Sequence, residues 1–258
     1  MKREEKLVAL IAVATLILGI SSASASTKPN PKAKSKISKT VVKAPAAKSP
    51  AAFKLSCSPT SATGHAPTKI SGKFGPLPHQ NKTFTLKTNC GDISFLADGI
   101  NAPYTTFALT VLAQSGYYDD TVCHRLTTAG LYVLQCGDPT ASGSGGPNIQ
   151  WPFENFPQVS TNDYPEGTIA MAVGCKTNDG LLSSSQFFIV YKDTTLTPQV
   201  PPGCAGTPHG GDEIFYPILG KVIAGLDIVK AIAAKGVYGG RTDGAPLQQI
   251  TINSVIVK

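Results

Sequence analysis

Short apolar segments separated by turn residues run from Thr83 to the end of the chain. The first two, 83–88 and 92–97, flank the triplet Asn89-Cys90-Gly91, which is typical of a tight β-hairpin. Six further short strands are predicted at 121–126, 131–135, 167–172, 186–191, 215–222 and 249–258.

Two other segments have the helical period. The first begins after Asn101, which is expected to cap it, and stops at Gly116. Its apolar residues recur at helical spacing and form a single stripe, made of Tyr104, Phe107, Ala108, Val111 and Leu112. The second helix is predicted at 226–235, directly before Gly236. Many short strands with two helices predict a mainly β fold, either a barrel or a sandwich.

The first 80 residues lack this patterning. Basic residues precede an apolar run at 7–20, and Ala23-Ser24-Ala25 fits a signal peptidase site, so an export signal is predicted. The run is shorter than the ~20 residues that a transmembrane helix needs, and a retained membrane anchor is the alternative. The predicted organisation is a signal peptide at 1–25, a disordered tether rich in Lys, Pro and Ala at 26–55, a short extension at 56–80 and a folded domain at 81–258.

Charge follows the same division. The chain has a formal net charge of +7, but residues 55–258 hold 12 basic and 14 acidic residues, so the excess comes from the N-terminal segment. The folded part is therefore not basic, and no nucleic-acid-binding motif accompanies it. The tether is expected to be a solvated linker or, alternatively, an attachment to a polyanionic surface of the cell envelope.

Six cysteines in an exported chain indicate disulfide bonds, and none of their spacings is that of a zinc site. A bridge between Cys57 and Cys90 would join the start of the domain to its first hairpin. Cys123 and Cys136 lie on neighbouring predicted strands, but strict alternation puts them on opposite faces. Their bridge therefore needs a bulge or a twist, and two buried free thiols are the alternative.

Two tracts carry the candidate chemistry. Cys123–Pro147 reads CHRLTTAGLYVLQCGDPTASGSGGP, and Ser183–Val190 reads SSSQFFIV. In this order they resemble the signature of the cyclophilin family of peptidyl-prolyl isomerases. The resemblance covers Thr83–Lys258 and implies a closed eight-stranded antiparallel barrel with a helix over each open end. Since side chains fill a barrel of this size, its binding groove would lie on the outer wall.

The resemblance also implies roles for single residues. Arg125 matches the family's catalytic arginine, and Gln135 and Gln186 match the two glutamines that fix the arginine and the peptide backbone. Other substrate-binding positions of the family are matched by Tyr132, Val133, Met171, Ala172, Phe188, Leu196 and Tyr216.

The chain departs from the family pattern in several places. Two extra residues separate Arg125 from Gln135, and Tyr216 stands where the family often has a histidine. Two segments that look inserted carry Cys175 and Cys204, which favours a bridge between these cysteines.

The function implied by the resemblance is rotation of X–Pro bonds in proline-containing client polypeptides after export, by a secreted or envelope-associated folding catalyst. Rotation breaks no covalent bond, so no metal or cofactor is required. The protein is expected to be a monomer that binds no nucleic acid and meets a membrane only through an uncleaved N-terminal anchor. The alternatives are a non-catalytic module that binds proline peptides on the same fold, and an unrelated disulfide-stapled barrel that carries a small ligand.

Overall fold

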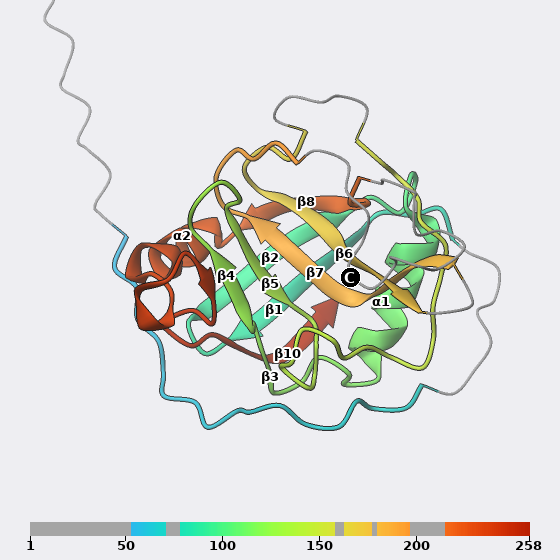
Figure 1. Ribbon diagram of the computed structural model, residues 1–258. Helices are drawn as coiled ribbons and strands as arrows, with labels where there is room; N and C mark the ends of the chain where they lie inside the picture. The colour runs from blue at the N-terminus through green and yellow to red at the C-terminus, as the bar shows by residue number, and fades with distance from the viewer. Residues whose placement is uncertain (1–52, 71–77, 158–162, 177–179, 197–214) are drawn as a thin grey trace, which may run out of the picture. The chain divides into compact units, whose positions relative to one another are not determined.

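The computed structural model of the protein describes residues 53–70, 78–157, 163–176, 180–196 and 215–258 (Figure 1). Within them lie two α-helices, α1 (Pro103–Gln114) and α2 (Leu226–Lys235), and a short 3₁₀ helix, η1 (Tyr238–Gly240). The strands are β1 (Lys82–Thr88), β2 (Gly91–Ala97), β3 (Thr121–Val122), β4 (Arg125–Thr127), β5 (Val133–Cys136), β6 (Thr168–Lys176), β7 (Gly180–Val190), β8 (Ile218–Ala224), β9 (Asp243–Gly244) and β10 (Thr251–Val257). The predicted signal peptide and nearly all of the predicted tether lie outside the described residues.

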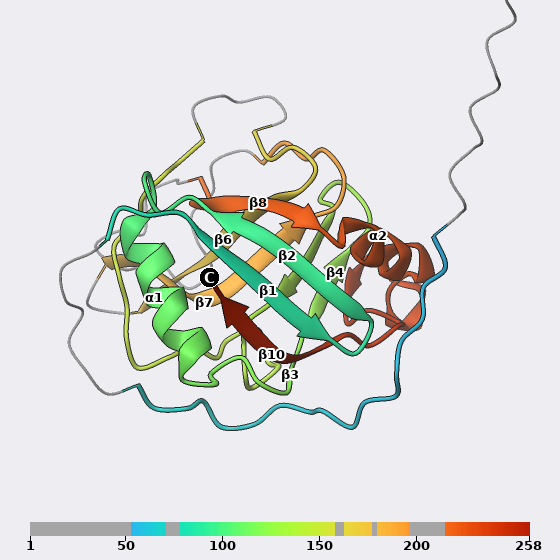
Figure 2. The ribbon, with the colours of Figure 1, turned by 180° about the vertical axis from the view of Figure 1, so that it is seen from behind.

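The strands form one curled antiparallel sheet, which confirms the mainly β fold. Their hydrogen-bonded order is β3-β10-β1-β2-β8-β6-β7-β5-β4-β9. The curl brings β4, β5 and β7 opposite β1 and β2, with α1 and α2 at opposite ends of the sheet (Figures 1 and 2). The closed barrel of eight strands is not confirmed, because ten segments pair in an order that runs from β3 at one end to β9 at the other.

The inner face of the sheet holds the main core. In the first hairpin the alternate residues Phe84, Leu86, Ile93 and Phe95 are at most 2% exposed. The rings of Phe84 and Phe95, which lie opposite each other on β1 and β2, stack with centroids 5.0 Å apart. Burial of each such side chain contributes roughly 1.5–3 kcal/mol, so the period-2 pattern decides which face of the hairpin points inward.

Of the two predicted helices, α2 agrees with its prediction and α1 differs at its N-terminus. α2 has the predicted bounds. α1 has Ala102 as its N-cap, so the prediction of a cap at Asn101 is wrong, and the Asn101 amide donates to the Asp98 carboxylate at 2.8 Å. The helix starts at Pro103, whose missing N–H costs nothing at this position. Tyr104, expected in the apolar stripe, is 45% exposed.

The described residues contain two disulfide bonds, Cys57–Cys90 and Cys123–Cys136. The second bond forms because the strand predicted at 121–126 is divided into β3 and β4, which interrupts the alternation of its side chains. Cys123 lies in that interruption and is buried together with Cys136, so the alternative of free thiols is wrong. Cys204 lies outside the described residues, and its bridge to Cys175 stays a prediction.

Residues 53–70 form an extended segment, the N-terminal strap, along the side of the domain that holds β3 and β10 (Figures 1 and 2). The first disulfide bond fixes its start. Further along, the His65 N–H donates to the Pro139 carbonyl at 2.8 Å. Ile70 exchanges two hydrogen bonds with the Asn148 side chain. The strap therefore lies against segment 139–148, which contains Gly143, Gly145 and Gly146.

In the part of the chain that the structure describes, no helix is long and apolar enough to cross a membrane. The same residues contain no group of three or more His, Cys, Asp or Glu side chains that could hold a metal ion.

Candidate active site

One row of residues crosses four neighbouring strands on the outer face of the sheet. Arg125 on β4 lies opposite Gln135 on β5, Gln135 lies opposite Phe188 on β7, and Phe188 lies opposite Ala170 on β6. Residues directly opposite each other in antiparallel strands share a face. Because neighbouring strands are ~4.8 Å apart, the backbones of Arg125 and Phe188 are separated by roughly 10 Å, which a short peptide can span.

A chain of hydrogen bonds connects the polar members of this face. Arg125 Nη1 donates to Gln135 Oε1 at 3.1 Å, and Gln135 Nε2 donates to Gln186 Oε1 at 2.8 Å. Gln186 Nε2 donates to the carbonyls of Gly143 and Gly145, at 3.1 and 2.8 Å. Two carbonyls require a donor at that end of Gln186. They therefore orient both amides and turn the Gln135 oxygen toward Arg125.

The buried carboxylate of Asp138 holds the loop that supplies these carbonyls. It accepts hydrogen bonds from the backbone N–H groups of Thr140, Gly143 and Gly145, at 2.8, 2.7 and 3.0 Å. Burial alone would raise the pKa of Asp138, but the hydrogen bonds from these three residues lower it below the ordinary value. Asp138 therefore stays ionised at neutral pH and keeps the loop carbonyls in place.

Phe188 lies in a small apolar cluster on the same outer face. Its ring meets Tyr216 edge-on, with centroids 5.4 Å apart, and tilts against Tyr164 at 6.3 Å. The Tyr164 hydroxyl donates to the Tyr216 carbonyl at 2.9 Å and so fixes the segment before β8. The remaining members of the cluster are Val133, Ala170, Val190, Leu131, Leu196, Phe215 and Ile218. The structure thus brings together four of the residues singled out from the sequence, Val133, Phe188, Leu196 and Tyr216.

Two predicted substrate-binding residues on β6, Met171 and Ala172, are not members of the Phe188 cluster. Met171 is fully buried in the main core on the inner face, and its N–H donates to the Pro217 carbonyl at 2.8 Å. Ala172 is half-buried at a β-bulge of β6. The register places Ala170, and not Met171, in the row with Phe188.

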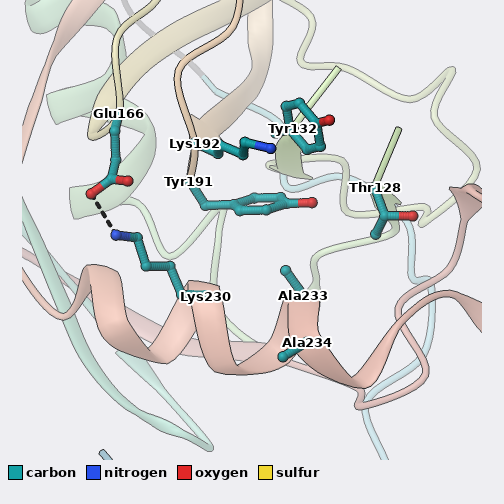
Figure 3. Close-up of a pocket in the computed structure, with 8 residues that line it drawn as sticks. All are labelled: Thr128, Tyr132, Glu166, Tyr191, Lys192, Lys230, Ala233 and Ala234. Carbon is teal, nitrogen blue, oxygen red and sulfur yellow. Dashed lines mark hydrogen bonds and ion pairs between the residues drawn. The ribbon is translucent and has the colours of Figure 1, made fainter. Parts of the chain in front are cut away.

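Tyr132 also lies outside the Phe188 cluster. It lines a pocket of about 460 Å³ between α2 and the ends of β5 and β7 (Figure 3). Lys192 Nζ lies 4.2 Å from the centroid of its ring, and Tyr191 meets that ring edge-on at 6.0 Å. Leu131, which no sequence pattern singled out, takes a place in the Phe188 cluster instead.

Asp243 is a second residue of the site that no sequence pattern singled out. Its Oδ1 accepts a hydrogen bond from Arg125 Nε at 2.8 Å, and its Oδ2 accepts one from Arg125 Nη2 at 2.7 Å. The hydrogen bond from Arg125 lowers the pKa of Asp243, and the same pairing raises the pKa of Arg125. Burial raises the pKa of Tyr216, and the positive charge of Arg125 lowers it in part. The site therefore holds a charged guanidinium beside an aromatic cluster.

Comparisons with known proteins identify the family. The family model described as cyclophilin type peptidyl-prolyl cis-trans isomerase/CLD matches residues 83–257. The chain belongs to the cyclophilin family. A Mycobacterium tuberculosis relative named "Probable peptidyl-prolyl cis-trans isomerase B" is 40% identical over 200 residues, which cover 72% of this cyclophilin and 58% of the relative. A peptidyl-prolyl cis-trans isomerase of Arabidopsis thaliana is 31% identical over 175 residues, which cover 67% of this chain and 94% of the relative.

The fold has solved relatives as well. A cyclophilin type peptidyl-prolyl cis-trans isomerase of Cryptosporidium parvum, solved in the presence of the dipeptide Ala-Pro, is 24% identical with a TM-score of 0.52. The alignment covers 68% of this chain and 98% of that one. The present cyclophilin spans about three fifths of the length of the mycobacterial relatives. The family match extends from β1 to β10 and leaves the N-terminal strap outside it.

Proposed function

We propose that this cyclophilin is a peptidyl-prolyl cis-trans isomerase that accelerates rotation of X–Pro bonds in exported client polypeptides. The observation that carries the proposal is the row that places Arg125 and Phe188 on one face of the sheet. Membership of the family supports it, and the Cryptosporidium relative was solved with a proline dipeptide.

The proposed mechanism depends on the electronic change at the prolyl nitrogen. Rotation has a barrier of ~18–20 kcal/mol because the twisted amide loses its resonance. The nitrogen gains a lone pair in that state, so a fixed N–H donor beside it stabilises the twisted amide more than the planar one. Arg125 is that donor in this proposal. One charge-assisted hydrogen bond, at ~1.5–3 kcal/mol, supplies one or two factors of ten in rate.

The aromatic cluster provides the second half of the mechanism. Phe188 is 5% exposed, with Tyr216 against its ring, and together they offer an apolar surface for the proline ring. Gln135 and Gln186 keep the guanidinium at a fixed place relative to that surface. The carbonyl side of the twisting bond is then free to turn while the ring stays held. Tyr132 and Met171 take no direct part in this mechanism.

An isomerisation assay on a proline-containing peptide, coupled to an isomer-specific protease, tests the proposal. The variants are Arg125→Ala and, as a control, Lys87→Ala. Lys87 is a matched control because its side chain, like that of Arg125, is 39% exposed and paired with an aspartate. We expect kcat/KM to fall at least tenfold in Arg125→Ala, as the lost hydrogen bond implies, and to change less than about twofold in Lys87→Ala.

A second function, binding of proline peptides without catalysis, is favoured by one observation. Asp243 already occupies two of the donors of Arg125. In that case the native chain and Arg125→Ala would both leave the uncatalysed rate unchanged, while peptide binding persists. The assay run with and without reductant also separates a direct effect of the site from an effect of the disulfide bonds.

We further propose that the protein acts outside the cytoplasm as a monomer. Two disulfide bonds in the described residues favour an oxidising compartment. Residues 1–25 would then be a cleaved signal, 26–55 a tether, 56–80 an extension and 81–258 the isomerase domain. N-terminal sequencing of the exported protein is expected to begin at Ser26. A chain that keeps residues 1–25 and sediments with membranes would show a retained anchor instead.

We also infer that the curled sheet closes into an eight-stranded barrel. β3 pairs with β10 and β4 pairs with β5, yet Cys123 and His124 alone separate β3 from β4 along the chain. One bent segment, 121–127, therefore touches both ends of the row of larger strands. If β3 and β4 count as one strand and the two-residue β9 is set aside, eight strands remain in a closed order.

A further inference from the structure

Asp243 holds Arg125 from a position 118 residues away in the sequence. The two carboxylate oxygens meet the Nε and Nη2 edge of the guanidinium at 2.8 and 2.7 Å, which is the parallel two-bond geometry of a well-aligned pair. Gln135 holds Nη1 from another side at 3.1 Å. A guanidinium has five N–H donors, so two remain, one on each terminal nitrogen.

The backbone that presents Asp243 is tied to the strand that carries Arg125. β9 pairs with β4, with Asp243 opposite Thr127. At the next position of this antiparallel pairing, the Thr128 N–H donates to the Thr242 carbonyl at 2.9 Å. The carboxylate is therefore presented by a strand in register with β4, and its distance from the guanidinium is set by backbone hydrogen bonds.

We propose that Asp243 is a positioning residue for the isomerase reaction: it holds the Arg125 guanidinium side-on, so that the two remaining donors are fixed before the peptide arrives. This inference rests on the proposed function. A free arginine side chain loses rotamer entropy when it is immobilised. With Asp243 and Gln135 in place, that loss has already occurred in the unbound protein, so it does not add to the barrier when Arg125 binds the twisted amide.

The alternative is that the ion pair of Asp243 and Arg125 only stabilises the fold. The solvent exposure of both side chains argues against this. The side chains of Asp243 and Arg125 are 53% and 39% exposed, and exposed ion pairs contribute little to folding. The hairpin pair of Asp92 and Lys87 is 52% and 39% exposed and lies on β1 and β2, which do not carry Arg125. It is therefore a closely matched control.

The experiment compares Asp243→Asn with Asp92→Asn in the isomerase assay. The asparagine keeps the shape of the side chain but has one acceptor oxygen and one NH₂ group, with two N–H donors, where the carboxylate has two acceptor oxygens. We expect kcat to fall about fivefold to tenfold in Asp243→Asn with KM changed less than about twofold, since the peptide surface is intact. Asp92→Asn should leave both constants unchanged, and both variants should melt within about 2 °C of the native chain.

A second readout reports the arginine itself. The chain has three arginines, Arg3, Arg125 and Arg241, so the Nε–H signal of Arg125 can be assigned in a nitrogen-15 spectrum by its loss in Arg125→Lys. We expect this signal to be protected from exchange in the native protein and in Asp92→Asn, and to broaden or vanish in Asp243→Asn. In an Arg125→Lys background, where side-on pairing is impossible, Asp243→Asn should change kcat less than about twofold.

The possible outcomes separate this inference from the proposed function. If Arg125→Ala loses activity while Asp243→Asn keeps the native kcat, the positioning role is wrong and the isomerase proposal stands. If Asp243→Asn is faster than the native chain, the carboxylate restrains the guanidinium and the inference is overturned. An equal loss from Asp243→Asn in the native and Arg125→Lys backgrounds would also refute it. A native chain without activity would remove the proposed function itself.

Discussion

A single methyl group added at Gly64 tests whether the N-terminal strap is held firmly against the loop that Asp138 ties, which runs from Asp138 to Gly145. A Cβ built on Gly64 would lie 2.1 Å from the carbonyl oxygen of Thr140 and 2.7 Å from its carbonyl carbon. Both neighbours are backbone atoms, so no flexible side chain can move aside. Gly64→Ala must therefore lift the strap away from Thr140, and the adjacent hydrogen bond from His65 to Pro139 breaks with it.

The size of the effect follows from these two losses. Forcing an extra methyl group into close packing costs typically 1–3 kcal/mol, and the net loss of one backbone hydrogen bond costs ~0.5–1.5 kcal/mol. The Cys57–Cys90 bond and the pair of Ile70 with Asn148 still hold the strap on either side. The opening is therefore local, at about 2–3 kcal/mol. This corresponds to roughly 30-fold to 150-fold faster exchange of the amide proton of His65.

Amide hydrogen exchange is the direct assay, with Ser61→Ala, an exposed position on the same strap, as the control. The isomerase activity of Gly64→Ala should fall less than about threefold, because Asp138 ties the loop independently of the strap. If the His65 amide is equally protected in Gly64→Ala and Ser61→Ala, the strap is not packed on Thr140 and the reasoning fails. A large loss of activity with unchanged exchange would contradict it equally.

Two further predictions concern the disulfide bonds and the buried tyrosines. Replacing Cys57 and Cys90 by alanine opens a loop of 33 residues, which should lower the free energy of unfolding by about 3–4 kcal/mol. Denaturant titration measures this, and an unchanged value would show that the strap detaches before the domain unfolds. Burial raises the pKa of Tyr117 and Tyr191 to about 12. Since these values exceed the ~10 of an unfolded chain, their contribution to stability is complete below pH ~10 and is lost as the pH rises toward 12. Tyrosinate absorbance should show both rings un-ionised at pH ~11 in the folded protein, and a midpoint near 10 for every tyrosine would contradict this.

Local patterns were sufficient for the regular parts of the fold. The first hairpin followed from two alternating segments around Asn89-Cys90-Gly91, and α2 from its apolar period and the glycine after it. The cap of α1 was misplaced because Pro103 and Asn101 are both acceptable near a helix start, and the sequence does not rank them. β9 was missed because a strand of two residues has no period to detect.

At the site, the resemblance and strand alternation give different placements for one residue, Tyr132. Counting back from Gln135, strict alternation puts Val133 and Leu131 on its face and Tyr132 on the other, which is the arrangement observed. The resemblance matched Tyr132 by its spacing from Gln135 and so placed it in the pocket. Alternation alone does not place Met171, because only the pairing with β7 reveals which residues of β6 share a face with the row.

The residues that hold Arg125 also explain why the sequence motif alone does not define the site. The guanidinium is oriented by a carboxylate from β9 and an amide from β5, and that amide is oriented in turn by the loop carbonyls through Gln186. Reversing either amide would set a carbonyl oxygen against another acceptor, which is costly in a buried position. The orientation of the donor is thus settled by contacts among segments far apart in the chain. A pattern of residue types records which groups are present, but the direction in which each donor points depends on this long-range order.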